Sequence, residues 1–320
     1  MASTPLFSVI IPTHNAGDYL RDAVESVMVQ DFAPDFEILI VNDHSTDSRS
    51  IDVLKSIASL GPMIRVLDNR GVRGPAATRN VGIMVAKGEW LAFLDADDIW
   101  PQNSLRIRIQ ILEQHPEIDW IAGDYRYWLE NGSLVAGAPA RVQSLEPAFL
   151  ERTPILLRRP VEICIPETPF PLGCVFLRAS LVRQVGGFNE TLWYGEDWYL
   201  WLNLAVFKDL IFVPETVLHV RRHGITLMNR PESLTSLASL APCKAFFDRR
   251  LRKYRRTIRW KIISEYRLLS RHNATAGNQL QACKFACLAL LWGLENTRQW
   301  KEVGRLARDT ACLLRKPSGH

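Results

Sequence analysis

Short runs of β-branched and aromatic residues alternate with helix-period segments over the first hundred residues. Four such runs predict buried strands, at 7–11, 36–41, 64–67 and 90–94. The stretches between them repeat apolar residues at helical spacing and predict helices at 19–30, 50–60 and 76–86. This alternation predicts an α/β fold whose sheet is doubly wound, mostly parallel and flanked by helices.

The pattern changes in the second hundred residues. After a predicted helix at 101–114, the stretch 120–135 predicts a β-hairpin with Asn131-Gly132 in its turn. Prolines are frequent between 139 and 171, and they predict irregular loops there. Regular structure is then expected in a strand at 174–177, a helix at 196–206, and strands at 211–213 and 217–221.

The chain after about residue 234 has no strand pattern, and it predicts three or four helices. We therefore expect one large domain over 1–234, with halves at 1–100 and 101–234. A basic α-helical C-terminal region is expected to follow at 235–320.

Polar residues follow each of the first four predicted strands. In open parallel sheets, ligands bind at the carboxyl ends of the strands, close to the point where the strand order reverses. We expect these polar residues to face one cleft, and they are Thr13-His14-Asn15, Asn42-Asp43, Asn69-Arg70-Gly71 and Asp95-Ala96-Asp97-Asp98.

Composition narrows the class of protein. The six cysteines have no zinc-site spacing, which favours small apolar residues in a reducing compartment. The first residues lack a signal-peptide pattern, and the longest apolar stretch, 285–294, is about half of what a spanning helix needs. We therefore expect a cytoplasmic protein.

Three carboxylates lie within four positions at the end of the fourth predicted strand. Asp95, Asp97 and Asp98 supply oxygen ligands only, which suits Mg²⁺ or Mn²⁺ bound together with substrate phosphates. The alternative is an acidic cluster that caps the helix starting near Pro101.

A series of short motifs, in a fixed order, resembles family 2 glycosyltransferases of the GT-A fold. The resemblance covers about residues 6–225. It is carried by SVIIPTHN at 8–15, Glu37 and ILIVNDHSTD at 38–47, Asn69-Arg70-Gly71, ATRNVG at 77–82, LDADD at 94–98, GGFNE at 186–190 and EDWYLWLNLA at 196–205. It makes 1–100 the nucleotide-binding half and 101–234 the acceptor half of a catalytic domain.

The resemblance also implies a site for the donor. It assigns Asp43 to a ring N–H of the base, which uracil, thymine and guanine all offer. It assigns Asp95 to the ribose and Asp97 to a Mg²⁺ or Mn²⁺ ion on the diphosphate. The base and ribose subsite is completed by Pro12, Thr13 and Asn15.

Two further positions each allow two interpretations. Arg79 follows small residues at a helix start, so it can approach the diphosphate or the base, or it can form a surface salt bridge. His223 resembles the late histidine that family members bring to the metal, but a lone histidine is as often structural.

Asp197 is the predicted catalytic base. Adjacent Glu196 and the flanking tryptophans are expected to raise its pKa through like charge and an apolar setting. In similar enzymes this aspartate takes the acceptor's proton in an inverting displacement, and Glu196 shapes the acceptor or phosphate side. The alternative is an acid pair stabilised by the helix dipole. Four aromatic residues nearby can either stack on a sugar ring or pack in the core, and the sequence favours neither role. They are Trp193, Tyr194, Trp198 and Trp201.

The predicted function is transfer of one sugar from a UDP- or dTDP-linked donor to a hydroxyl acceptor, glycan or lipid-linked, in cell-surface glycan synthesis. No Q-x-x-R-W element follows the ED motif, which argues against a processive polymerase. His14, Asn42 and His44 depart from the family pattern around the base pocket, so they leave the nucleotide open. The alternatives are a nucleotidyltransferase of similar fold and a nucleotide-sugar-binding module.

A basic amphipathic helix is predicted near the start of the C-terminal region. Its apolar stripe, Leu251, Tyr254, Ile258 and Ile262, lies among eight basic residues between 249 and 261. The segment 249–262 can contact an anionic membrane at the inner face, or it can pack on the protein, which the pattern favours. Nucleic-acid binding is not expected, because no recognised module accompanies the charges.

Overall fold

The protein divides into two compact units. The computed structural model describes residues 5–31, 35–137, 139, 142–166, 170–222, 240–275 and 277–293 of the chain. One unit comprises Met1–Pro231 and the other Glu232–His320. The predicted boundary at residue 234 lies outside the described residues, and the division into donor and acceptor halves stays a prediction.

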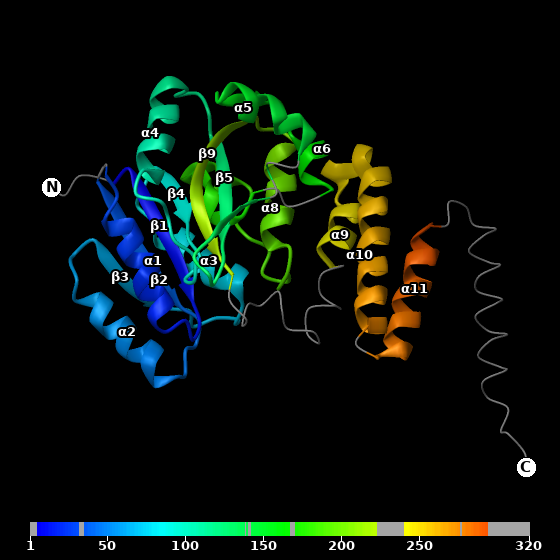
Figure 1. Ribbon diagram of the computed structural model, residues 1–320, viewed down its shortest axis with the longest axis horizontal. Coiled ribbons are helices and arrows are strands. Elements are labelled where there is room, and N and C mark those ends of the chain that lie inside the picture. The colour runs from blue at the N-terminus through cyan, green and yellow to red at the C-terminus, as the bar shows by residue number, and fades with distance from the viewer. Residues whose placement is uncertain are drawn as a thin grey trace, which may run out of the picture. The chain divides into compact units, whose positions relative to one another are not determined.

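One nine-stranded sheet forms the centre of the N-terminal unit (Figure 1). Its order is β3-β2-β1-β4-β8-β5-β9-β7, with β6 paired to β5. The strands are β1 Phe7–Thr13, β2 Phe36–Asn42, β3 Ile64–Asp68, β4 Trp90–Phe93, β5 Trp120–Trp128, β6 Leu134–Ala136, β7 Ile155–Leu157, β8 Val175–Arg178 and β9 Leu210–Arg221. This mixed α/β architecture with a large central sheet confirms the predicted fold class.

The first four strands are parallel, and their order reverses between β1 and β4. Chain connections run outward from β1 through β2 to β3 and then return to place β4 on the other side of β1. Such a reversal leaves a crevice at the carboxyl ends of the two strands on either side. The segments after Thr13 and after Phe93 therefore meet at this edge.

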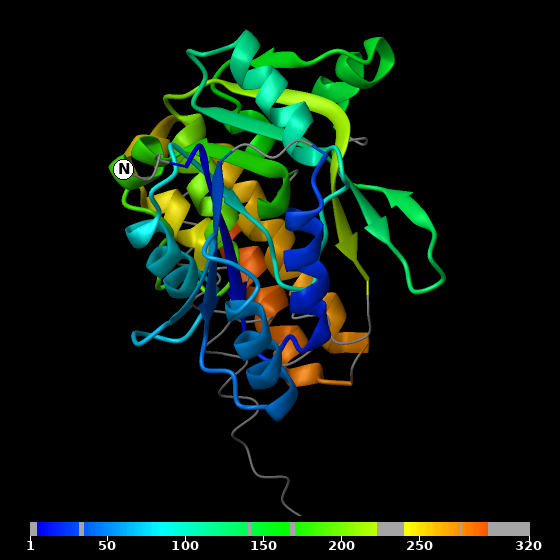
Figure 2. The ribbon, with the colours of Figure 1, turned by 90° about the vertical axis from the view of Figure 1, so that its left-hand side faces the viewer.

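Helices cover both faces of the parallel strands. Figure 2 shows α1 and α3 on opposite sides of them. The helices of this part are α1 Asp18–Met28, α2 Ser48–Ala58, α3 Pro75–Val85 and α4 Ser104–Gln114. A Cβ atom at Gly82 of α3 would lie 2.6 Å from the side chain of Ile10, so the absence of a side chain lets α3 pack closely on β1.

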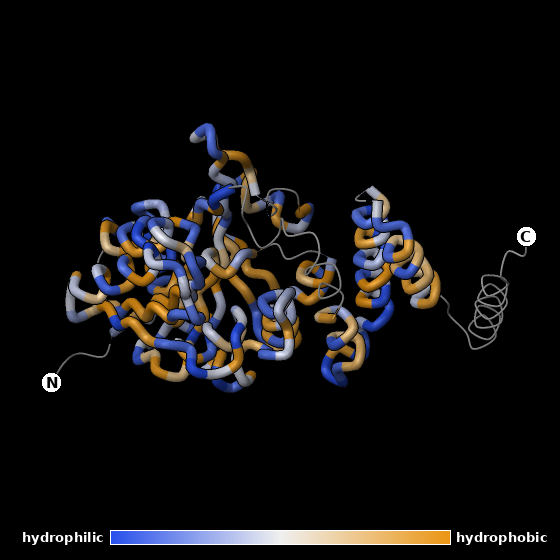
Figure 3. The backbone as a smooth tube through the Cα atoms, turned by 90° about the horizontal axis from the view of Figure 1, so that it is seen from below, coloured by the Kyte–Doolittle hydropathy of each residue, from blue (hydrophilic) through white to orange (hydrophobic). Residues whose placement is uncertain are grey.

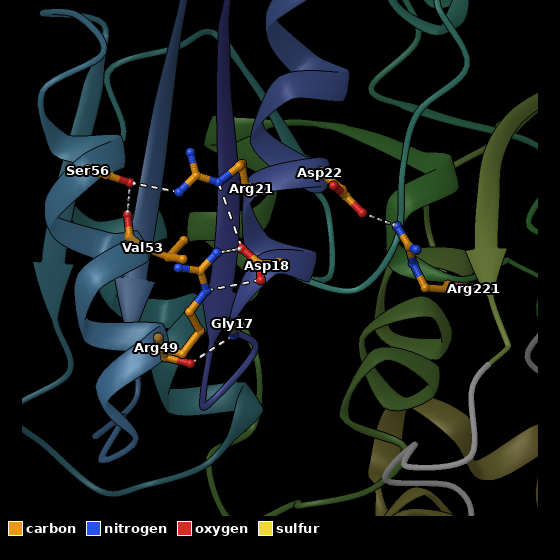
Figure 4. Close-up of polar contacts among 9 residues, drawn as sticks. Gly17, Asp18, Arg21, Asp22, Arg49, Val53, Ser56 and Arg221 are labelled. Carbon is orange, nitrogen blue, oxygen red and sulfur yellow. Dashed lines mark hydrogen bonds and ion pairs between the residues drawn. The ribbon is translucent and has the colours of Figure 1, made fainter.

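Polar contacts join α1 to α2 at the outer surface (Figure 4). Asp18 accepts two hydrogen bonds from the Arg49 guanidinium, and Arg21 donates to the Ser56 hydroxyl. The side chains of Asp18 and Arg49 are 59% and 62% exposed, so water screens this ion pair and we expect it to add little to stability.

The second half of the sheet is mixed in direction. β8 is antiparallel to both β4 and β5, whereas β9 is parallel to β5. β5 and β6 form the predicted hairpin, with Gly132 of its turn at φ 80°, and this hairpin projects from the body of the unit (Figure 2). The two strands predicted at 211–213 and 217–221 are one strand, β9.

An irregularity in the pairing with β5 explains why β9 resembled two strands. Its register shifts between Gly123 and Asp124 and again between Asp124 and Tyr125. Pro214 and Glu215 fall in the interrupted stretch, and proline cannot donate a ladder hydrogen bond. The break in the sequence pattern therefore marks a bulge within a continuous strand.

The proline-rich region and the residues after it, up to 184, contain short elements rather than long loops. They are η2 Gln143–Leu145, α5 Glu146–Glu151, β7, α6 Val161–Cys164, η3 Leu172–Cys174 and α7 Ala179–Gln184. The next helix, α8 Glu196–Ala205, is buried along most of its length. Its residues Trp198 and Trp201 donate indole hydrogen bonds to the carbonyls of Cys164 and Phe170, which ties this region to α8.

The C-terminal unit is helical, as predicted, over its described residues, 240–275 and 277–293. Its elements are α9 Leu240–Phe247, η5 Arg249–Tyr254, α10 Arg255–Thr275 and α11 Gln279–Gly293. Hydrophobic and hydrophilic stretches alternate along these helices (Figure 3). Leu251, Ile258 and Ile262 are fully buried, so the apolar stripe seen in the sequence packs within the protein. In the part of the chain that the structure describes, no helix is long and apolar enough to span a bilayer.

Candidate active site

Asp43 lies at the centre of a buried polar network just past the end of β2. One carboxylate oxygen accepts a hydrogen bond from the Asn69 side chain at 2.8 Å, and the other accepts one from the backbone N–H of Gly74 at 3.1 Å. Asn69 also donates to the carbonyl of Val72. These bonds fix the loop before α3, and each carboxylate oxygen keeps a second lone pair for a ligand.

Asn15 lies just after β1, and its side chain holds the loop that follows the neighbouring strand β2. Its side-chain oxygen accepts hydrogen bonds from the backbone N–H groups of Thr46 and Asp47, at 2.8 and 3.3 Å. His14, beside it, bonds through Nδ1 to the carbonyl of Asp43 at 2.7 Å. Thr13 accepts the N–H of Asp43, so the predicted residues Thr13, Asn15 and Asp43 lie together; Pro12 precedes them in β1.

His44 occupies the position where the family pattern has glycine. Its φ of 57° lies in the left-handed region that favours glycine. A non-glycine residue in that conformation costs on the order of 1 kcal/mol. The loop therefore has the left-handed backbone that favours glycine, although residue 44 is a histidine.

Arg79 joins two parts of the chain that are distant in sequence. One terminal nitrogen donates to Asp95 after β4 and the other to Glu196 at the start of α8, each at 2.7 Å. Burial opposes the guanidinium charge, but the Coulombic attraction of Asp95 and Glu196 outweighs it and raises the pKa of Arg79. Arg79 is thus a fixed cation inside the protein. Only 5% of this residue is exposed, which rules out the alternative interpretation of a surface salt bridge.

A second link holds the GGFNE motif against α3. The Asn80 amide donates to the carbonyl of Phe188 and to Glu190, and its oxygen accepts the N–H of Phe188. Gly187 has φ 70°, and a Cβ atom there would lie 2.6 Å from the Asn80 oxygen. Glycine is therefore required for this contact, which fixes the segment leading into α8.

Glu196 and Asp197 form an acidic pair at the N-terminus of α8. Burial raises the pKa of Glu196 to about 7, against the attraction of Arg79 and with help from the charge of Asp197. Burial also raises the pKa of Asp197, although its carboxylate accepts the N–H of Trp198 at 2.6 Å. The negative charge of Asp95 acts in the same direction, so the end of β4 and the start of α8 form one electrostatic site.

The three tryptophans near this pair differ in burial. Trp198 is 2% exposed and Trp201 is fully buried, so both belong to the core. Trp193 is 41% exposed, and its indole lies within 3.4 Å of where a Cβ atom of Gly74 would be. Trp193 is therefore the tryptophan of this group that a sugar ring can reach.

Arg221, which is not among the predicted site residues, fixes the acidic loop after β4. Its backbone N–H donates to the Asp98 carboxylate at 2.9 Å, and its Nε donates to the carbonyl of Asp97 at 3.0 Å. The guanidinium also bonds to Asp22 of α1 (Figure 4) and lies over the ring of Trp128. No motif marks a single arginine at a strand end, so only the fold reveals this role.

The carboxylates after β4 differ in what remains open to a ligand. Asp98 is 6% exposed and is engaged by Arg221, and burial together with Asp97 and Asp95 raises its pKa. Asp95 bonds to Arg79 but keeps 40% of its side chain exposed. Asp97 is half-buried at the same edge.

This donor set fits a divalent cation shared with a substrate. Within the described residues no three His, Cys, Asp or Glu side chains converge on one point to hold a metal. Mg²⁺ is commonly held by one or two carboxylates together with substrate phosphates and water. Asp97, with Asp95 beside it, supplies such oxygen ligands, and Asp98 is turned to the protein. The predicted ligand His223 lies outside the described residues.

Fold and site together define a glycosyltransferase of the GT-A class. The model of the family described as glycosyl transferase family 2 matches residues 8–136. The *Escherichia coli* protein WfgD, a UDP-Glc:α-D-GlcNAc-diphosphoundecaprenol β-1,3-glucosyltransferase, is 30% identical over 206 residues, which are 64% of this chain and 70% of WfgD. The chain belongs to glycosyltransferase family 2.

Other relatives agree with this assignment. An uncharacterised glycosyltransferase of *Rickettsia felis* is 31% identical over 219 residues, which are 68% of this chain but 33% of that relative. *Staphylococcus aureus* TarS 1–349, solved with UDP-GlcNAc, has a TM-score of 0.66 at 19% identity, covering 89% of this chain and 81% of TarS. The *Pyrobaculum calidifontis* mannosyltransferase PcManGT, solved with GDP-Man and Mn²⁺, has a TM-score of 0.56 at 18% identity, covering 94% and 84%.

Proposed function

We propose that this glycosyltransferase is inverting and metal-dependent, and that it moves one sugar from a nucleoside diphosphate sugar to a hydroxyl acceptor. The observation that carries the proposal is the Arg79 bridge. The Arg79 side chain donates hydrogen bonds to both Asp95, just after β4, and Glu196, which precedes Asp197. Asp95 is therefore separated from this acidic pair by a single side chain. A donor held at the strand ends would thereby lie beside a carboxylate of raised pKa.

Asp197 is the proposed catalytic base. In the reaction its carboxylate takes the proton of the acceptor hydroxyl while that oxygen attacks the anomeric carbon. The bond from the anomeric carbon to the diphosphate breaks on the opposite face, and its electron pair leaves with the diphosphate. Attack from the face opposite the leaving group inverts the anomeric configuration.

Arg79 is proposed as a positioning residue. Both of its terminal nitrogens are engaged by carboxylates inside the protein, so it orients Asp95 and Glu196. Asp97 is the proposed holder of Mg²⁺ or Mn²⁺, which supplies positive charge to the leaving diphosphate when bound. The Mn²⁺ named for PcManGT supports this choice of metal.

A UDP- or dTDP-linked sugar is the proposed donor. Asp43 has a free lone pair on each carboxylate oxygen for the ring N–H that uracil and thymine carry. UDP sugars are also named for WfgD and for the TarS complex. The proposed acceptor is a glycan or lipid-linked sugar of the cell surface, in keeping with the diphospholipid acceptor named for WfgD. We propose that Trp193 stacks on a sugar ring at this site.

Replacement of Asp197 by asparagine tests the assignment. The amide cannot accept the proton, so we expect transfer to fall by at least about 100-fold, the usual contribution of a general base. Donor affinity should change by less than about threefold, because a residue acting only in the transition state lowers kcat without weakening binding. Transfer is measured with UDP and dTDP sugars and a panel of lipid-linked acceptors, and donor affinity by calorimetry.

A matched control makes the same change at the surface. Asp52→Asn on α2 removes an exposed carboxylate whose pairing partner is the exposed Lys55, and it should leave both quantities unchanged. If Asp197→Asn transfers sugar as fast as the parent, Asp197 is not the base. If the parent binds a donor but neither transfers nor hydrolyses it with any metal, the chain is a binding module and the proposed reaction is wrong.

A further inference from the structure

A groove lined by arginines lies in the C-terminal unit, outside the transferase site. It runs along α10 between α9 and α11 and has a volume of about 850 Å³. Arg255, Arg256, Arg259 and Arg267 line it, together with the apolar side chains of Trp260 and Leu290. None of the side chains that line it is acidic.

These four arginines lack the carboxylate partners that neighbouring basic residues have. In the same unit Arg250 pairs with Asp248 at 2.7 Å, and Lys261 pairs with Glu265 at 2.7 Å. Among the described residues, no ion pair involves any of the four groove arginines. The groove is therefore a concentrated positive surface, and it attracts anions.

Helical spacing aligns the cations with an apolar surface. Arg256, Trp260, Ile263 and Arg267 follow each other at intervals of three or four residues, so they share one face of α10. This face differs from the stripe of Leu251, Ile258 and Ile262, which is buried. The Trp260 side chain is 58% exposed and Leu290 is 65% exposed.

Contacts with Phe246 of α9 hold two of the groove arginines, Arg255 and Arg259, in place. Arg255 donates its Nε–H to the carbonyl of Phe246 at 2.9 Å, and its guanidinium lies over the Phe246 ring. Arg259 lies over the same ring, 5.8 Å from its centre. Two of the four cations are thus held in place before any ligand binds, which lowers the entropy lost on binding.

We propose that this groove binds the phosphate headgroups of anionic phospholipids and docks the C-terminal unit on a membrane surface. Arginine forks match phosphate oxygens, and exposed Trp and Leu beside cations are the pattern of an interfacial helix. The proposed membrane contact lies at 255–267. The sequence pattern had allowed a membrane contact at 249–262, but the apolar stripe of that segment is buried. The proposed contact does not depend on the proposed transferase reaction.

Vesicle binding by the full chain tests the proposal. We expect the protein to sediment with phosphatidylglycerol vesicles and to remain in solution with phosphatidylcholine vesicles. Binding should weaken as salt rises, because the attraction is screened. The groove variant Arg256→Gln with Arg267→Gln alters two exposed side chains and should weaken partitioning roughly 30-fold, since each basic residue near an anionic surface contributes about fivefold.

The matched control removes the same charge elsewhere in the unit. Arg252→Gln with Arg271→Gln changes two exposed arginines that do not line the groove, and partitioning should fall less than about threefold. Trp260→Phe should lose most of the tryptophan quenching that brominated phosphatidylglycerol causes in the parent, whereas Trp193→Phe should not.

Three results would overturn the proposal. The first is absence of binding to anionic vesicles at low salt. The second is equal loss in the two arginine pairs, which would mean a diffuse attraction to total charge. The third is binding of single-stranded RNA or DNA oligonucleotides in preference to vesicles, with loss in the groove variant, which would make the occupant a nucleic acid.

Discussion

Replacement of Arg79 by methionine should destabilise the N-terminal unit in a pH-dependent way. The change leaves Glu196, with 10% of its side chain exposed, without its cation. Removing one partner of a buried ion pair costs about 3–5 kcal/mol. Asp95 is 40% exposed, so loss of that bond adds less than about 1 kcal/mol.

Part of this cost is returned. The Arg79 Nε–H is buried and has no hydrogen-bond partner among the described residues, so removing it recovers about 1–3 kcal/mol. Methionine keeps an apolar contact with Phe188, over whose ring the guanidinium lies. The expected net loss is about 2–3 kcal/mol, which lowers the Tm by about 5–10 °C for a unit of this size.

The pH dependence follows from the pKa of Glu196. That pKa is about 7 in the folded protein against an ordinary value of 4.5, so its protonated form is favoured and stability falls as pH rises through this range. Arg79 lowers this pKa, and without it the pKa rises further. The variant's deficit should therefore be small near about pH 5 and full near about pH 8.5.

Denaturant unfolding of four proteins measures the effect: the parent, Arg79→Met, Glu196→Gln and the double variant. The amide needs no cation, so Glu196→Gln should recover at least about half of the loss in the Arg79→Met background. Arg49→Met is the matched control, since it breaks an exposed, solvent-screened pair with Asp18 and should leave stability nearly unchanged at either pH. A deficit in Arg79→Met that equals the control, or that changes neither with pH nor with Glu196→Gln, would mean that Arg79 does not stabilise the protein through Glu196.

Three further predictions concern the acidic loop after β4, the contact of Asn80 with the GGFNE motif, and the proposed catalytic base. Arg221→Gln frees the loop that carries Asp97 and Asp98, so kcat should fall at least about 10-fold and the KM for metal should rise. Steady-state rates at varied Mn²⁺ measure both quantities. An unchanged dependence of the rate on metal would contradict this role of Arg221. Asn80→Ala removes three hydrogen bonds and should cost about 2–3 kcal/mol in unfolding measurements, and a loss under about 0.5 kcal/mol would argue against the link. The rate should fall on acidification at a pH above the ordinary aspartate value of 3.8, because the base works deprotonated and burial raises the pKa of Asp197. A rate that stays flat down to that value would be inconsistent with Asp197 as the base.

Local periodicity was sufficient to predict the elements of the first hundred residues. Each β-branched run between helix-period segments became a parallel strand. β1, β2 and β4 are buried on both faces and are therefore mostly apolar, whereas β3 lies at the sheet edge and is only partly buried. The antiparallel insertion of β8 between β4 and β5 was beyond such patterns. It pairs Trp90 with Arg178, and no local rule specifies a partner at that separation.

The same limit applies to the candidate site. Motifs identified Asp43, Asp95 and Asp197 as polar residues at element ends, but they gave no indication that Arg79 reaches Glu196 across 117 positions. The sequence also presented Asp95, Asp97 and Asp98 as equivalent, whereas Arg221 engages Asp98 and leaves the others nearer the solvent. Roles that depend on tertiary contact could be assigned only from the fold.

We propose above that acidic side chains just after β4 bind a nucleoside diphosphate through a divalent metal. Calorimetric titration of the protein with UDP, in the presence and absence of Mn²⁺, measures this directly. We predict that Mn²⁺ tightens UDP binding at least about 10-fold, and that Asp97→Asn removes most of that gain while UDP binding without metal is unchanged. UDP and dTDP affinities that are the same with and without metal, or a gain that survives Asp97→Asn, would contradict the account.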